Sequence, residues 1–209
     1  MYYGFRDDIG GYECGGACWD LYAFLPNQRI WVGLPPEGGP ETIDCERGGC
    51  LTYTIAEGKL KLSSGETYTI GSSEEGSLAI NDVALYPVQP AADGLKLQGT
   101  YEYIGYSGLI GVNAASSSWT ETLTFSEDGT FESADLTLAS LDAKSSAANS
   151  SAAKSDKGTY RISGNTIELA YSDGTVVRSL FFDHEPGGVN ALQSIQIGSN
   201  RFYISEENE

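Results

Sequence analysis

The sequence predicts an all-β protein made of two tandem, small, antiparallel up-and-down β-barrels. The first supporting observation is a period-two alternation of apolar and polar residues, clearest in residues 157–182. There Tyr160 and Ile162 alternate with polar residues, which places both on one buried face of a strand. The turn sequences Ser163-Gly164-Asn165 and Ser172-Asp173-Gly174 separate the strands and favour tight hairpins. Such short links leave no room for a crossover helix, so neighbouring strands must run antiparallel.

The second observation is a shorter version of the same pattern in the first half of the chain. Residues 51–62 match residues 158–169 without a gap, and the aligned apolar pairs are Tyr53 with Tyr160, Ile55 with Ile162, Leu60 with Ile167, and Leu62 with Leu169. Two flanking hairpins match in the same order, Phe24 and Ile30 with Phe125 and Phe131, and Ile80 and Tyr86 with Ile197 and Tyr203. Hairpins that match in order indicate a tandem repeat. The alternative is one continuous β-sandwich shared by both halves.

In the first half, turn-forming residues separate short strands. We expect strands at residues 2–5, 19–25 and 29–34, a hairpin over 51–62, a strand at 67–70 and a hairpin over 78–88. A long loop rich in Pro, Gly and acidic residues covers residues 35–49. The small and polar residues 89–94 form the best boundary, which gives an N-terminal domain at 1–90 and a C-terminal domain at 95–209.

In the second half, we expect a strand at 97–103, a hairpin from 119 to 138, three strands within 157–182 and a hairpin over 194–204. Residues 105–117 are expected to form a flexible loop, 139–156 a mobile Ala/Ser-rich surface loop, and 206–209 a frayed tail. The count is about eight strands in each half, and eight hairpin-linked strands can close into a barrel without edges.

Composition excludes some partners. The chain of 209 residues has a formal net charge of −17, which opposes binding to nucleic acid because phosphate recognition needs clustered Lys and Arg. No apolar run is long enough to span a membrane. Met1 leads directly into YYGFRDD, without a signal segment. We therefore expect either a cytosolic chain or one that begins at a mature end.

The four cysteines form two closely spaced pairs, Cys14 with Cys18 and Cys45 with Cys50, and each pair flanks a Gly-Gly. Cys18 and Cys50 precede the second and fourth expected strands, which start at the same barrel rim, so all four should gather there. Three pairings are open, and we expect the two local disulfides because their glycines permit tight loops. A four-thiolate zinc site and free thiols are the alternatives. Disulfides would indicate an oxidising compartment, hence an extracellular, periplasmic or cell-surface location.

The remaining polar residues predict no catalytic, cofactor-binding or metal-binding site. His184 is the single histidine and is expected to be a solvated loop residue beside acids and a proline. Glu127, Asp128, Asp173 and Asp82 lie in expected turns, where such side chains bond their own backbone. The sequence contains no nucleophile elbow, calcium loop or phosphate-binding glycine loop.

The three tryptophans are the best candidates for a ligand or interface site. Trp19 and Trp119 are placed at nearly equivalent positions at the start of the second strand of each repeat, and Trp31 follows in the third strand. They serve either as core plugs at the barrel ends or as an aromatic rim for a ligand or partner. The inward-facing residues of the second half are bulky, so we expect filled barrels.

The second half resembles the bacterial lipocalin-like (calycin-type) β-barrel domains, and the first half is a degenerate copy. The residues that carry the resemblance are Gly99-Thr100-Tyr101, Leu123-Thr124-Phe125, Asp128-Gly129-Thr130-Phe131, Gly158-Thr159-Tyr160-Arg161-Ile162 and Gly164-Asn165. Tyr101 stands where true lipocalins have the Trp of a Gly-x-Trp motif. The resemblance implies a secreted or envelope β-barrel, in a group whose members mostly have no assigned function.

These observations favour a non-enzymatic secreted or cell-surface protein that acts as an interaction or structural assembly module. It would be, for example, a subunit of an extracellular polymer that joins its neighbour through the short N-terminal strand or another unpaired edge. The alternatives are a lipocalin-like binder of a small apolar ligand, an enzyme of unknown reaction that uses His184 or a carboxylate cluster, and an acidic inhibitor or immunity protein for a basic partner.

Overall fold

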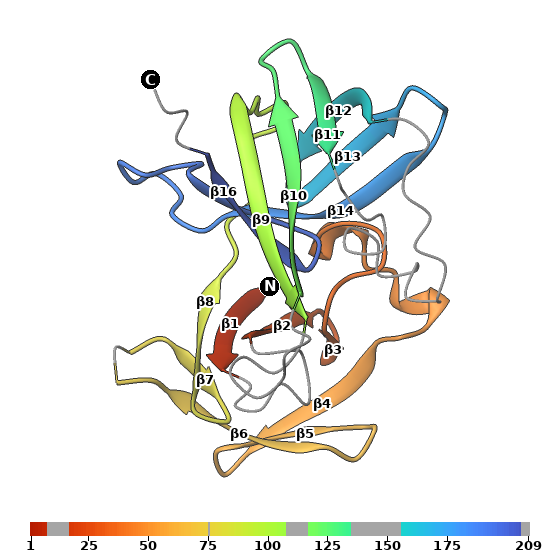
Figure 1. Cartoon of the computed structure of the whole chain (residues 1–209). Coiled ribbons are helices and arrows are strands. Elements are labelled where there is room, and N and C mark those ends of the chain that lie inside the picture. Colours follow the sequence, from red (N-terminus) through yellow and green to blue (C-terminus); the bar gives the residue numbers. More distant parts are fainter. Residues whose placement is uncertain (8–16, 75, 108–116, 135–155, 206–209) are drawn as a thin grey trace. The chain divides into compact units, whose positions relative to one another are not determined.

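The computed structural model describes residues 1–7, 17–74, 76–107, 117–134 and 156–205, and it is all-β, with two closed antiparallel barrels of eight strands each (Figure 1). In each barrel every strand pairs with its neighbours in sequence, and the last strand pairs with the first. The two predicted barrels are confirmed. The alternative of one continuous sandwich is wrong, because each sheet closes on itself.

The strands agree closely with the expected hairpins. The first barrel consists of β1 (Tyr2–Asp7), β2 (Ala17–Leu25), β3 (Arg29–Val32), β4 (Leu51–Ala56), β5 (Lys59–Leu62), β6 (Thr67–Ser72), β7 (Leu78–Ile80) and β8 (Val83–Pro87). The second consists of β9 (Gly99–Ser107), β10 (Ser117–Phe125), β11 (Thr130–Ala134), β12 (Lys157–Ser163), β13 (Thr166–Tyr171), β14 (Val176–Asp183), β15 (Ser194–Ile197) and β16 (Asn200–Ile204). Two short 3-10 helices, η1 (Pro40–Thr42) and η2 (Cys45–Arg47), lie between β3 and β4 in the sequence.

One expected loop is partly a strand. β9 begins at Gly99, later than expected, and continues to Ser107, into the segment predicted to be a flexible loop. Its whole length pairs with β10, so this extension of β9 is held by hydrogen bonds to β10. The rest of that predicted loop, residues 139–155 of the Ala/Ser-rich segment and the tail 206–209 lie outside the described residues.

The internal repeat extends to the register of the strands. Equivalent strands carry equivalent cross-strand pairs, which are Phe24–Ile30 and Phe125–Phe131, Tyr53–Leu62 and Tyr160–Leu169, and Tyr3–Tyr86 and Glu102–Tyr203. A slip of one residue would turn every core side chain to the solvent face. Because the register is shared, each position on these strands of the first barrel has a counterpart in the second barrel.

The contacts divide the chain into two compact units with one barrel each. The described parts of the first unit lie within Met1–Gly33 and Ile43–Val88. The second unit contains Gln89–Ser107 and the chain from β10 onward, and it also contains Leu34–Thr42. The second unit therefore includes the chain from Gln89 onward and, in addition, a segment that lies between β3 and β4 in the sequence.

The 34–42 segment is held on the turn between β12 and β13. Glu41 Oε1 accepts hydrogen bonds from the Asn165 backbone N–H (3.0 Å) and from Thr166 Oγ1 (2.6 Å), and the Gly39 N–H donates to Thr166 Oγ1 (2.9 Å). A Cβ atom at Gly39 would lie 2.5 Å from the Cβ of Asn165, so only glycine allows this approach. The segment is therefore a structural part of the second unit.

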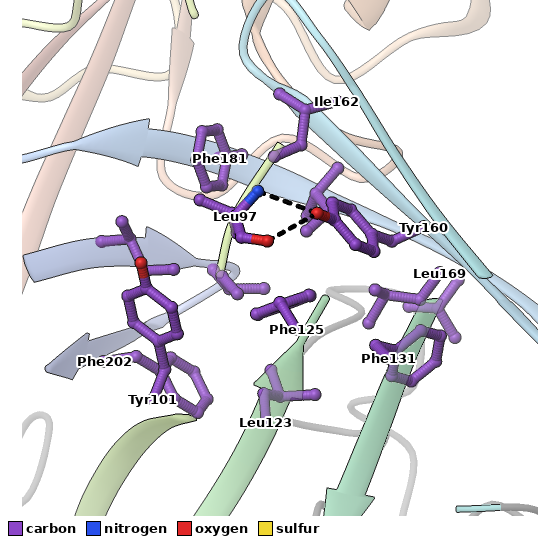
Figure 2. Close-up of a cluster of buried hydrophobic side chains, with 14 of the residues drawn as sticks. Leu97, Tyr101, Leu123, Phe125, Phe131, Tyr160, Ile162, Leu169, Phe181 and Phe202 are labelled. Carbon is purple, nitrogen blue, oxygen red and sulfur yellow. Dashed lines mark hydrogen bonds between the residues drawn. The ribbon is translucent and has the colours of Figure 1, made fainter. Parts of the chain in front are cut away.

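Buried apolar side chains fill the second barrel, and Tyr101, Leu123 and Phe125 belong to this core (Figure 2). At the end where β9 begins, Leu97 closes the interior and is fully buried. The Tyr160 hydroxyl accepts from the Leu97 N–H (2.8 Å) and lies 3.0 and 3.1 Å from the carbonyl oxygens of Leu97 and Ser126 (Figure 2). Burial raises the pKa of Tyr160, so the hydroxyl stays neutral and can donate.

The first barrel has a smaller buried core. Its buried side chains are Tyr22, Ile30, Leu60, Leu62, Ile80 and Leu85. Tyr2, Phe24 and Tyr53 are only partly buried and pack edge to face, with ring centroids 6.1 Å apart for Tyr2–Phe24 and 5.3 Å apart for Phe24–Tyr53. Partly buried aromatic rings thus extend this smaller core.

Removing the Tyr160 hydroxyl will destabilise the second barrel. In Tyr160→Phe the buried Leu97 N–H loses its acceptor, and we expect the free energy of unfolding to fall by about 1–3 kcal/mol. Urea denaturation measures this change. Tyr203→Phe is the control, because Tyr203 is 52% exposed. Equal effects of the two substitutions would contradict the role of Tyr160 in closing the barrel.

Candidate functional site

Four aromatic side chains lie on the outer surface of the first barrel, on the adjacent strands β8, β1 and β2. Tyr2 packs on the core, so the alternate residues Tyr3 and Phe5 of β1 face outward. Trp19 pairs with Phe5, and Tyr86 pairs with Tyr3, so both share this outer face. We call the four residues, Tyr3, Phe5, Trp19 and Tyr86, the aromatic face.

The rings of the aromatic face contact one another in a row. The ring centroids of Phe5 and Trp19 are 5.2 Å apart, those of Tyr3 and Trp19 6.1 Å, and those of Tyr3 and Tyr86 5.9 Å. Phe5 is 49% and Tyr86 42% exposed. Packed aromatic rings hold one another in place at little cost in conformational entropy. The face is therefore a packed aromatic surface that is open to solvent at Phe5 and Tyr86.

Acidic residues and a groove border the aromatic face. A groove of about 430 Å³ lies on the outer side of the barrel, and its lining includes Ala79, Ala84 and Tyr86 together with Glu74 and Asp82. Ala79 and Ala84 pair across β7 and β8, and small side chains there leave room between the larger ones. The border of the aromatic face is thus acidic on the groove side.

Three members of this face were not predicted from the sequence. Tyr3, Phe5 and Tyr86 were not among the candidate residues, although the spacing of Tyr3 and Phe5 already placed them on one side of a strand. The difficulty is that Tyr2 and Gly4 occupy the other side. An aromatic residue on each side does not tell which side is buried. Only the pairing of β1 with β2 and β8 decides this.

The three tryptophans do not form one site. Trp31 packs against Gly49, where a Cβ atom would overlap the indole ring. Trp19 and Trp119 both lie near the start of the second strand of their barrels, but they are one residue apart in the shared register, where the counterpart of Trp119 is Cys18. This shift of one residue turns the side chains to opposite faces. Trp19 consequently lies outside the first barrel, and Trp119 faces the interior of the second at its rim.

Cys45 and Cys50 form the expected local disulfide, with their Cα atoms 5.2 Å apart. Cys18 is also disulfide-bonded, and Cys14 lies outside the described residues. Because the sulfurs of Cys45 and Cys50 are joined to each other, they are not available as thiolates. The alternative of a four-cysteine zinc site is therefore wrong.

His184 is not the solvated loop residue that was expected. It follows β14 directly, its ring centroid lies 4.9 Å from that of Phe182, and its Nε2 lies 3.1 Å from Gln196 Oε1. Burial, and secondarily the positive charge of Arg201, lower the pKa of His184 to about 4. The imidazole is therefore neutral at pH 7 and bonded to an amide.

Other surfaces offer less distinctive chemistry. Two grooves of about 510 and 600 Å³ on the second barrel are lined largely by glycine and hydroxyl-bearing residues. Among the described residues, no three His, Cys, Asp or Glu side chains are placed to hold a metal ion. Within the same ranges no helix is long and apolar enough to cross a membrane.

No protein-family model, no curated protein and no solved structure matches this chain. The aromatic face and its acidic border are therefore the features of the first barrel on which a functional assignment can rest.

The low pKa of His184 makes stability depend on pH. Between about pH 4 and 6.5 the unfolded chain binds a proton at His184 that the folded chain does not bind, so stability falls as the pH decreases. From pH 7 to pH 4.5 we expect wild type to lose on the order of 2 kcal/mol more than His184→Gln. Urea unfolding of both proteins at several pH values measures the difference.

Wild type and His184→Gln have the same carboxylates, so the comparison isolates the contribution of the imidazole. A difference in unfolding free energy that stays constant over this pH range would contradict the burial of a neutral imidazole.

Proposed function

We propose that this protein is a non-catalytic interaction module that binds a basic protein partner through the aromatic face. The supporting observation is the row of Tyr3, Phe5, Trp19 and Tyr86 on the outside of a closed barrel, in which Phe5 and Tyr86 are exposed and Tyr3 and Trp19 are partly buried. Residues that dominate protein–protein binding are enriched in Trp and Tyr and lie at the centre of an apolar patch with a polar rim. The aromatic face has this composition.

Charge favours a partner that is rich in Lys and Arg. Glu74 and Asp82 line the adjacent groove, Asp7 is exposed at the end of β1, and the whole chain has a net charge of −17. Complementary charge speeds association and selects among partners. It also disfavours a second copy of this acidic chain. Arg and Lys side chains can in addition stack on the exposed rings.

Side-chain docking is better supported than strand addition. β1 pairs with β2 on one side and, over Tyr2–Gly4, with β8 on the other. Addition of a foreign strand needs a free backbone edge, and the closed arrangement gives these residues neighbours on both sides. The proposed assembly therefore uses the outer face of the strands instead of their edges.

The same proposal includes a secreted or cell-surface setting and a lipocalin-like ancestry. The Cys45–Cys50 disulfide supports an oxidising compartment. The eight-stranded up-and-down topology of each barrel supports the resemblance to lipocalin-like domains. The core of bulky side chains in the second barrel supports a scaffold role over storage of a large apolar ligand.

A random peptide library displayed on phage tests the proposed binding with a defined probe. Selection on wild type should enrich peptides in which Lys or Arg flank an aromatic or aliphatic residue. The double variant Phe5→Ser/Tyr86→Ser should bind them at least about tenfold more weakly, a loss of about 1.4 kcal/mol, and the affinity for wild type should fall with added salt.

The matched control is Val176→Ser/Tyr203→Ser, which removes two large exposed side chains from the second barrel. Peptides that lack basic residues, or that bind the Phe5→Ser/Tyr86→Ser protein as tightly as wild type, would refute the proposal. Sedimentation analysis adds a further check. A concentration-dependent dimer that is lost in the same double variant would identify the partner as a second copy and overturn the assignment of a basic partner.

A further inference from the structure

The connection between β3 and β4 of the first barrel passes through the second unit. We call its residues 34–42 the strap, because they belong to the second unit while the residues before and after them belong to the first. The Thr166 hydroxyl accepts a hydrogen bond from the Gly39 N–H (2.9 Å) and donates one to Glu41 Oε1 (2.6 Å), which also accepts from the Asn165 N–H (3.0 Å). One hydroxyl of the second barrel therefore takes part in two of the three bonds that hold the strap.

The turn between β12 and β13 presents a fixed surface to the strap. The Asn165 side chain is buried, and its Nδ2 donates to the carbonyl oxygens of Gln89 (2.9 Å) and Phe181 (3.2 Å). The strap approaches this turn closely, since a Cβ atom at Gly38 would lie 2.5 Å from Thr166 Oγ1. The contact therefore combines close packing with specific hydrogen bonds.

The two strands that this connection joins form the shortest pairing in the first barrel. β3 and β4 are paired only at Arg29–Thr52 and Ile30–Leu51, and we call this pairing the seam. Every other pairing of neighbouring strands in the barrel is longer. Local opening starts where few backbone hydrogen bonds have to break. The seam is therefore the place where this barrel opens first.

A short covalent path links the strap to β4. Only Ile43 and Asp44 separate the strap from Cys45, which forms a disulfide with Cys50. β4 begins at Leu51, the next residue. Because the disulfide bypasses the residues between the two cysteines, the start of β4 stays within a few residues' reach of the docked strap.

Docking of the strap lowers the entropic cost of keeping the seam closed. Without it, residues 33–50 form one long connection, and the cost of closing a loop rises with the number of its free residues. Docking fixes the centre of this connection. The disulfide and the salt bridge between Arg29 Nη1 and Glu46 Oε1 (2.8 Å) fix its far end on β3. Separation of β3 from β4 is therefore easier once the strap has left the turn.

We propose that the strap is a latch: its docking on the β12–β13 turn keeps the seam of the first barrel closed, and its release lets the seam open. The latch couples two units that have separate cores, and it acts through the covalent connection between them. Coupling of this kind is reciprocal, so separation of β3 from β4 also favours release of the strap. The proposal does not depend on the function of the aromatic face.

Amide hydrogen exchange of the full chain, followed by NMR, tests the latch. The reporter is the Tyr53 N–H, which donates to the Gln28 carbonyl (2.9 Å) across the seam. Thr166→Val keeps the shape of the side chain but removes both bonds of the hydroxyl, one of them to a carboxylate, and should raise the exchange rate of Tyr53 at least about tenfold. The Ile70 N–H, which is bonded to the Gly58 carbonyl (3.0 Å) away from the seam, should exchange as in wild type.

Three further variants separate the latch from a general loss of stability. Glu41→Ala breaks the same contact from the strap side and should also speed exchange of Tyr53, whereas Thr166→Ser retains the hydroxyl and should behave as wild type. Ile162→Val weakens the core of the second barrel without altering a residue that bonds to the strap, and should leave Tyr53 unchanged. Exchange of Tyr53 that stays at the wild-type rate in Thr166→Val, or that rises equally in Ile162→Val, would overturn the proposal.

Discussion

Closure of the two sheets is the constraint on which the rest of the structure depends. Because β1 pairs with β8 and β9 pairs with β16, neither sheet is left with a free edge strand, and backbone edges are not the natural route to assembly. Bulky side chains occupy the interior of the second barrel. What remains for recognition is the outer surface of the strands and the barrel rims. The aromatic face is a site of the first kind.

Equivalent positions of the two barrels carry different side chains. On the first two strands of each barrel, the inward-facing positions at the rim hold Arg6 and Asp20 in one case and Gly105 and Glu121 in the other. In the first barrel Arg6 and Asp20 form a salt bridge, and in the second the Trp119 indole N–H donates to Glu121 Oε1. Placement of Trp119 over Gly105 requires the absence of a side chain there. The two barrels therefore differ in chemistry at positions where they agree in geometry.

The strands could be predicted from sequence because alternation and turn residues are local signals. Asn165 illustrates the limit, since its place in a turn was predicted, but not its bonds to the carbonyl oxygens of Gln89 and Phe181. The docking of Glu41 on Thr166 also joins residues far apart in sequence, and no periodicity reports such a contact. Glu121 did leave a signal, because it shares the alternating positions of Leu123 and Phe125. An acidic residue at a position where the alternation predicts an apolar one indicates a buried acidic side chain.

The most direct test of the closed architecture is a set of nuclear Overhauser contacts between backbone protons of the first and last strand of each barrel. Closed barrels predict contacts between Tyr3 and Tyr86 and between Glu102 and Tyr203, which face each other across the closing pairs. They also predict slow exchange of the Ser205 amide proton, which bonds to the Thr100 carbonyl. Missing contacts across either pair, together with fast amide exchange in β1 and β16, would show an open sheet and contradict closure.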